Sequence, residues 1–108
     1  IMRWLSCLAA AAVAAGCFRE VIRTFEIHVP QMRTPQAVQM VEQAMRSFDT
    51  NVLIRLETDL TNRIVRVTYN SERAARRNFE RAIVLLGFDA NDLRGDPTRR
   101  AQLPEELR

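Results

Sequence analysis

The chain of 108 residues contains no lysine, one histidine, three glycines and two cysteines. Arginine therefore supplies all sixteen basic residues, and with thirteen acidic residues the net charge is +3. The acidic residues are interspersed with the arginines, so the small excess of positive charge forms no continuous basic patch of the kind that nucleic-acid binding requires. We therefore expect no nucleic-acid partner.

The two cysteines, Cys7 and Cys17, both lie close to the N-terminus. The sequence after Cys17 therefore excludes a disulfide, a thiolate metal site and a cysteine nucleophile. Only two glycines follow that position, which excludes a glycine-rich phosphate loop, and one histidine does not assemble a Ser-His-acid set. Carboxylate pairs such as Asp89 and Asp92 lie in polar segments typical of solvated charges. We predict that the protein is not an enzyme, with no catalytic residues and no cofactor.

An uncharged, alanine-rich run from Trp4 to Phe18 follows a single basic residue, Arg3. As a helix this run would rise about 22 Å, which is short of the roughly 30 Å hydrocarbon core of a bilayer. Its length and weak hydrophobicity are typical of the apolar region of a signal peptide.

Near the end of this run, positions 13–17 have the sequence Val-Ala-Ala-Gly-Cys. This segment resembles a bacterial lipoprotein signal, in which the cysteine is lipidated. The resemblance implies a signal peptide over residues 1–16 and a tether over 17–20. It also implies attachment to membrane lipid through Cys17, in the bacterial cell envelope and facing the periplasm or exterior. Two alternatives stay open: a signal peptide cut elsewhere, or a retained short membrane anchor.

Three later segments alternate between apolar and polar residues, as half-buried strands do. We predict strands over Val21–Val29, Val52–Thr58 and Arg63–Tyr69. The residues expected on their core faces are Phe25, Ile27, Val29, Val52, Ile54, Leu56, Val65, Val67 and Tyr69.

Helical spacing separates these strands. Thr34-Pro35 is typical of an N-cap followed by proline in the first turn, and apolar residues recur from Ala37 to Phe48. A second helix is expected after Asn70 or Ser71, with Gly87 at its C-terminal cap. Phe88–Ala90 is expected to form a short fourth strand.

The predicted order βαββαβ indicates an α+β fold of the ferredoxin-like type. We expect a four-stranded antiparallel sheet with two helices on one face, formed by residues 21–93, and a polar C-terminal tail over 94–108. The open sheet face would mix arginine with aliphatic residues, which suits a protein interface, although a plain solvated face is the alternative. The expected interaction residues are Leu53, Arg55, Ile64 and Arg66.

The stretch from Phe25 to Asn91 resembles the heavy-metal-associated domain of copper chaperones and metal-transporting ATPases. The matching pieces are Glu26–Val29, Met32–Ala37, Val38–Ala44, Arg63–Tyr69 and Ala82–Ala90. The family binds soft cations through a Met-x-Cys-x-x-Cys loop. With Met32 aligned to the family methionine, Thr34 and Ala37 stand at the cysteine positions. The resemblance therefore implies the fold and a degenerate loop without its ligands.

We predict a membrane-tethered, non-catalytic protein-interaction module, as an accessory subunit of a membrane protein complex. The alternative is a copper- or zinc-handling lipoprotein that uses non-cysteine or partner-supplied ligands, for which His28 is a weak candidate. An arginine-rich helix face would either meet anionic lipid headgroups or be simply solvated. Its residues are Arg73, Arg76, Arg77 and Arg81.

Overall fold

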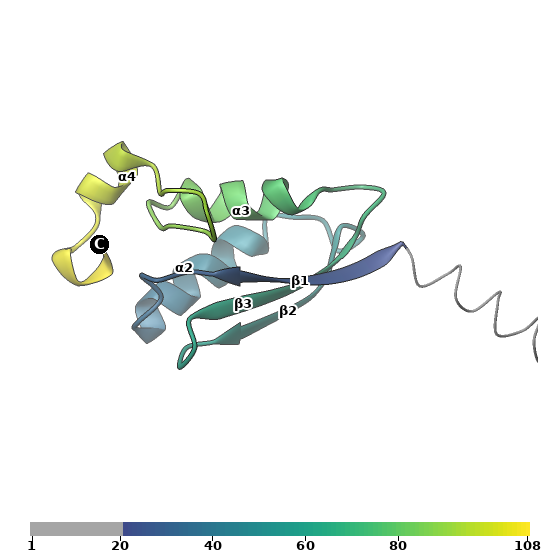
Figure 1. The fold of residues 1–108 in the computed structure, drawn as a ribbon, viewed down its shortest axis with the longest axis horizontal. Helices are drawn as coiled ribbons and strands as arrows, with labels where there is room; N and C mark the ends of the chain where they lie inside the picture. The colour runs from purple at the N-terminus through teal and green to yellow at the C-terminus, as the bar shows by residue number, and fades with distance from the viewer. Residues whose placement is uncertain (1–20) are drawn as a thin grey trace, which may run out of the picture.

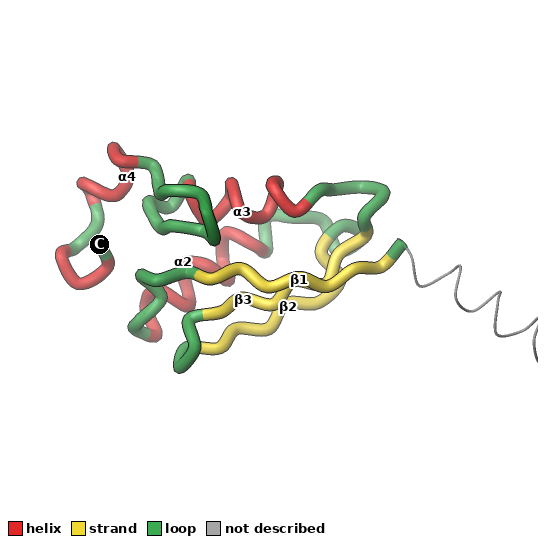
Figure 2. Tube along the Cα trace, in the orientation of Figure 1, coloured by secondary structure: helices red, strands yellow, loops and turns green. Residues whose placement is uncertain are grey.

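The computed structural model describes residues 21–108, in which two helices pack on one face of a small sheet (Figures 1 and 2). The elements are β1 (Ile22–His28), α2 (Pro35–Met45), β2 (Leu53–Asp59), β3 (Ile64–Asn70), α3 (Arg76–Val84), α4 (Pro97–Gln102) and the 3-10 helix η1 (Glu105–Leu107). Their order and layers are compatible with a ferredoxin-like α+β fold.

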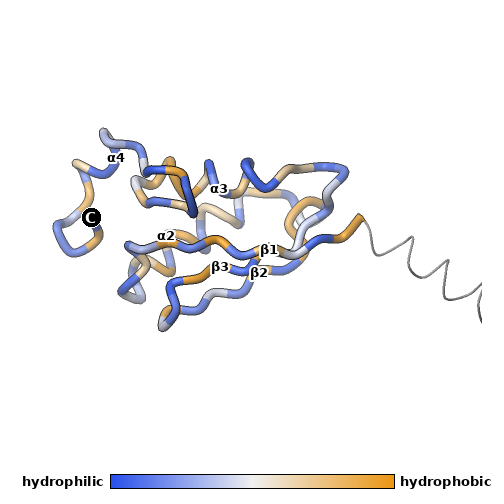
Figure 3. The backbone as a smooth tube through the Cα atoms, viewed as in Figure 1, coloured by the Kyte–Doolittle hydropathy of each residue, from blue (hydrophilic) through white to orange (hydrophobic). Residues whose placement is uncertain are grey.

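The sheet of the described residues has three strands in the order β1-β3-β2, and both pairs are antiparallel. Its core face is built by the alternation of β1 and β3, which is visible in the hydropathy colouring of Figure 3. Phe25 and Ile27 of β1 lie opposite Val67 and Val65 of β3, and all four side chains are buried. The predicted strands β1 and β3 are confirmed.

The predicted fourth strand, Phe88–Ala90, does not join the sheet in the part of the chain described. Phe88 and Ala90 are fully buried, but Ala90 pairs only with Leu93 in an isolated bridge. Asn91 has a positive φ of 53°, which reverses the chain at this point. Because the chain turns back so early, the segment is too short to lie along β1.

The predicted face of β2 is wrong at its N-terminal end. Leu53 lies opposite Tyr69 on the core side and packs against the core, whereas Ile54 is 48% exposed. A register shift between Leu53 and Arg55 causes this exchange, because one extra residue in a strand reverses the faces of the residues before it. The sequence prediction assumes strict alternation before Leu56, and for this reason it places Leu53 on the open face.

The two long helices begin and end where local capping allows. Thr34 Oγ1 accepts a hydrogen bond from the N–H of Ala37 at 3.3 Å, which confirms the predicted N-cap of α2. The second helix, α3, begins at Arg76, later than the predicted cap at Asn70 or Ser71. The C-cap of α3 is Leu85, two residues before the predicted Gly87, and Gly87 has φ of +99° in the turn that follows the helix.

The segment expected as a polar tail, residues 94–108, folds against the domain. The N–H of Asp96 donates to the carbonyl of Val84 at 3.0 Å, at the end of α3. Leu107 of η1 is only 1% exposed and belongs to the same buried cluster as the sheet residues. A few apolar residues in a polar segment are therefore enough to anchor it.

Candidate functional site

The segment from Met32 to Ala37 corresponds to the metal-binding loop of the heavy-metal-associated domain. In this chain, the residues of that segment make contacts that stabilise the fold. Met32 and Ala37 are fully buried. Between them, the hydroxyl of Thr34 accepts the N–H of Ala37 and so serves as the helix cap. At the two positions where the family has cysteine, this chain therefore has a capping hydroxyl and a buried methyl group.

His28 lies at the end of β1 with an exposed side chain. Its backbone is tied to Asn91: the N–H of His28 donates to Asn91 Oδ1 at 2.8 Å, and its carbonyl accepts the N–H of Asn91 at 3.0 Å. Across the sheet His28 faces Ile64. Within residues 21–108, no three His, Cys, Asp or Glu side chains gather as a metal site would require.

The open sheet face carries a network of ion pairs centred on Arg66. Its guanidinium contacts Glu26 Oε2 at 2.9 Å and Glu57 Oε2 at 3.3 Å, and Arg55 Nε contacts Glu57 Oε1 at 2.8 Å. The hydrogen bond to Glu26, followed by its charge, raises the pKa of Arg66 above its usual value. The network links Arg55 and Arg66 through Glu57 on this face.

Of the four predicted interaction residues, three share the open face. Arg55, Ile64 and Arg66 lie opposite Thr68, Asp59 and Glu57 in the register of β2 and β3. Ile64 is half-buried there. Leu53 lies on the core side instead, for the reason given above.

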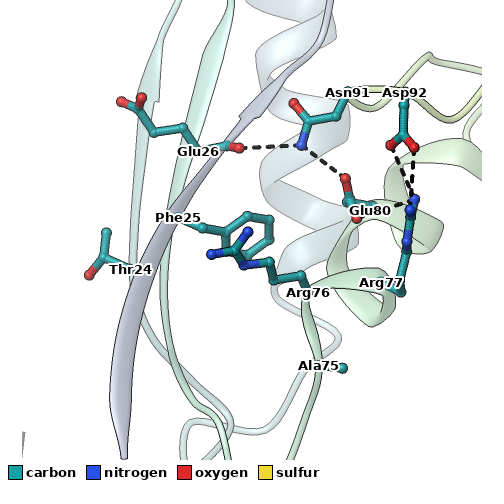
Figure 4. Close-up of a pocket in the computed structure, with 9 residues that line it drawn as sticks. All are labelled: Thr24, Phe25, Glu26, Ala75, Arg76, Arg77, Glu80, Asn91 and Asp92. Carbon is teal, nitrogen blue, oxygen red and sulfur yellow. Dashed lines mark hydrogen bonds and ion pairs between the residues drawn. The ribbon is translucent and has the colours of Figure 1, made fainter. Parts of the chain in front are cut away.

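A pocket of about 820 Å³ opens between β1 and α3, at the edge of the sheet (Figure 4). The residues that line it come from three separate segments: Thr24, Phe25, Glu26, Ala75, Arg76, Arg77, Glu80, Asn91 and Asp92. In Figure 4 the Phe25 ring points into the pocket, whereas the Thr24 and Glu26 side chains point to the other side of the strand.

Ion pairs and a ring contact arrange the charges around this pocket. Arg77 contacts both oxygens of Asp92, at 3.1 and 3.3 Å, which lowers the pKa of Asp92 through the hydrogen bonds and the charge. The buried Glu80 accepts from Asn91 Nδ2 at 2.9 Å and lies 3.7 Å from Arg77. The guanidinium of Arg76 lies over the Phe25 ring, 5.5 Å from its centroid.

A second polar cluster joins the loop before α2 to the C-terminal segment. Asp89 accepts the N–H of Gly95 at 2.8 Å and Nε2 of the buried Gln31 at 3.1 Å, and Arg100 lies 3.4 Å away. Burial raises the pKa of Asp89, but the hydrogen bonds and the charges of Arg100 and Arg94 outweigh it, so the pKa is lowered overall. All of these groups are engaged with one another, so the cluster serves the fold.

Phe25, Arg76 and Asn91 are not among the site residues predicted from the sequence. Phe25 and Arg76 are distant in sequence, and no local spacing connects them. The pair Asn91-Asp92 does carry a turn signal, because both residue types favour turns and tolerate the left-handed conformation.

Cys17, the predicted lipidation site, and residues 1–20 as a whole lie outside the described residues. Within residues 21–108, no helix is long and apolar enough to span a bilayer.

The chain is similar in structure to a solution NMR structure of a ZiaAN sub mutant. The TM-score is 0.57 at 17% sequence identity, and the match covers 66% of this chain and 97% of that one. No protein-family model and no curated protein sequence matches the chain. At this identity the likeness extends to the fold alone, so the function must be argued from the surfaces described above.

Proposed function

We propose that this chain is a non-catalytic protein-interaction module, held at the bacterial cell envelope as an accessory subunit of a membrane protein complex. The observation that carries the proposal is the sheet face left open by the two helices. It presents Ile64 beside Arg66, with Arg55 further along β2, and the two guanidinium groups contact Glu26 and Glu57. A face that combines arginine with aliphatic side chains suits recognition of a protein surface.

The degenerate loop supports the same proposal. The Thr34 hydroxyl is used as a helix cap and Ala37 is buried, so a soft cation finds no sulfur ligand at the two loop positions. Metal handling is the second candidate, favoured by the shared fold and by the resemblance of the loop segment. It would require ligands such as His28 or groups supplied by a partner.

Titration of the full chain with copper(I) and with zinc, in detergent, distinguishes the two candidates. We expect the interaction module to bind neither metal tightly, because within residues 21–108 no three His, Cys, Asp or Glu side chains gather as a metal site requires. A one-to-one complex with submicromolar affinity that is lost in His28→Ala would favour metal handling instead. His28→Ala leaves the backbone bonds to Asn91 in place, so a loss of metal binding would report on the imidazole.

Attachment to the membrane is the remaining part of the proposal. Cys17 is the only cysteine after the signal-like segment, and a lipidated cysteine at that position would tether the domain through residues 17–20. The tether would hold the N-terminal end of β1 close to the bilayer surface.

A further inference from the structure

The outer edge of β1 is the feature that carries a further inference. In an antiparallel pair, each residue directs its N–H and C=O either toward its partner strand or away from it. The N–H of Val29 donates to Arg63, and the carbonyl of Val21 accepts from Ser71, so the odd-numbered residues face β3. The residues that direct their backbone groups away from the sheet are Ile22, Thr24, Glu26 and His28.

Asn91 covers only one end of this edge. It bonds to both backbone groups of His28, and its Nδ2 donates to the carbonyl of Glu26 at 3.3 Å. No described residue pairs with the outward backbone groups of Ile22 and Thr24 or with the N–H of Glu26. A strand edge with free backbone groups is a template for another strand.

The pocket between β1 and α3 lies beside the uncovered part of the edge (Figure 4). A strand added next to Thr24 would direct alternate side chains into this pocket, toward Phe25 and Arg76. Its other side chains would extend the open sheet face. The space that a fourth strand would fill is therefore present, and residues 21–108 fill only its far end, at His28.

The charges at the uncovered end are positive. Arg77 is neutralised by Asp92 and Glu80, and Glu26 by Arg66. Arg76 contacts the Phe25 ring, and among the described residues it forms no ion pair with a carboxylate. The adjoining hollow adds two further arginines and one carboxylate: Arg23, Arg73 and Glu72. A negatively charged segment complements this end of the edge.

The opposite edge of the sheet, on β2, is less suited to strand addition. The register shift between Leu53 and Arg55 interrupts its regular pairing. Irregularities of this kind twist an edge away from further pairing. Within residues 21–108, the β2 edge is therefore irregular, whereas the β1 edge is regular and is covered only at the His28 end.

We propose that the β1 edge binds an extended segment of a partner protein, which adds a fourth strand next to Ile22–Glu26. The segment carries an acidic side chain that pairs with Arg76. This inference rests on the proposed function, since it names the surface and the kind of partner that the module uses. Main-chain hydrogen bonds supply the affinity, and the pocket and Arg76 supply the selectivity.

The test uses the full chain in detergent micelles and two blocked synthetic peptides of about eight residues, slightly longer than an average strand. One alternates valine with glutamate and the other valine with lysine. We expect the glutamate peptide to bind at least about tenfold more tightly, because only it complements Arg76. Amide hydrogen exchange should then slow at Thr24 and Glu26, whose N–H groups face outward.

Two matched substitutions locate the binding site. Thr24→Pro removes one outward N–H and leaves the β1–β3 hydrogen bonds intact, whereas Thr24→Val keeps that N–H. We expect Thr24→Pro, but not Thr24→Val, to abolish binding of the glutamate peptide. Arg76→Gln should reduce the preference for glutamate over lysine about tenfold, and it serves as the second test if the proline variant fails to fold.

Equal binding of the two peptides, no binding of either, or protection confined to β2 would overturn the proposal. Protection of Thr24 in the absence of peptide, together with a dimeric mass, would assign the edge to a second copy of the chain and overturn it as well. If the Thr24→Pro variant co-isolates with a protein from native membranes as well as the wild type does, the proposed interaction module is supported. Only the assignment of its binding surface to the β1 edge is then wrong.

Discussion

At the scale of single residues, Asp89 joins three parts of the molecule. Its carboxylate accepts from Gly95 and Gln31 and lies near Arg100, so it connects the loop before α2 to the C-terminal segment. The lowered pKa means that the folded state favours the ionised form more than the unfolded state does. The resulting stabilisation is fully present above the ordinary pKa of 3.8, and it is lost as the pH falls through the lower pKa of the folded protein.

We expect Asp89→Asn to lower the free energy of unfolding at neutral pH by about 1 to 2 kcal/mol, because the charged hydrogen bonds and the attraction to Arg100 are lost. Urea unfolding at a series of pH values measures this. The difference between wild type and variant should shrink as the pH falls through the lowered pKa of Asp89, because the wild-type carboxyl then becomes protonated as well. Glu106→Gln, at an exposed position, is the control. A difference that stays constant with pH would contradict the role of the charge.

At the scale of elements, the register of β2 decides which side chains build the core. Leu53→Ala should lower the free energy of unfolding by about 1 to 2 kcal/mol, because Leu53 packs against the core opposite Tyr69. Ile54→Ala should change it by less than about 0.5 kcal/mol, because Ile54 is exposed. Chemical unfolding of the two variants checks this. A larger loss of stability for Ile54→Ala than for Leu53→Ala would contradict the register shift and support the strict alternation predicted from the sequence.

In the structure, the C-terminal segment, residues 94–108, is part of the folded domain. Leu107→Ala removes a fully buried side chain and should lower the free energy of unfolding by about 2 to 3 kcal/mol. The neighbouring exposed residue provides the control, Glu106→Ala, with an expected change under about 0.5 kcal/mol. If thermal unfolding gives the two variants the same midpoint, the segment does not contribute to the core.

Much of the fold could be predicted from local patterns. The alternation around Ile27 and Val67, the cap at Thr34 and the glycine at position 87 each depend on a few neighbouring residues. The register shift at Leu53 and the pairing of Asn91 with His28 depend on residues that lie across the sheet, which no local pattern contains. The pocket could not be predicted either, because Phe25 and Arg76 meet only after β1 and α3 have packed together.

At the scale of the whole molecule, the proposed membrane attachment and the described fold belong to different parts of the chain. Residues 21–108 form a buried core, and Cys17 lies outside these residues. We expect mass spectrometry of the wild-type protein to show an N-terminal Cys17 that carries lipid. Cys17→Ser should abolish that modification, because serine has no thiol to form the thioether. An unprocessed N-terminus on the wild-type protein would contradict the lipid anchor and support a retained apolar helix.

The proposed function is the binding of another protein at the membrane. Native mass spectrometry of the full chain, extracted in mild detergent from the membranes in which it is made, measures this binding. We expect a complex of fixed stoichiometry that contains the lipid-modified chain and one protein partner, without a bound metal ion. A chain that emerges alone and carries copper or zinc would contradict it.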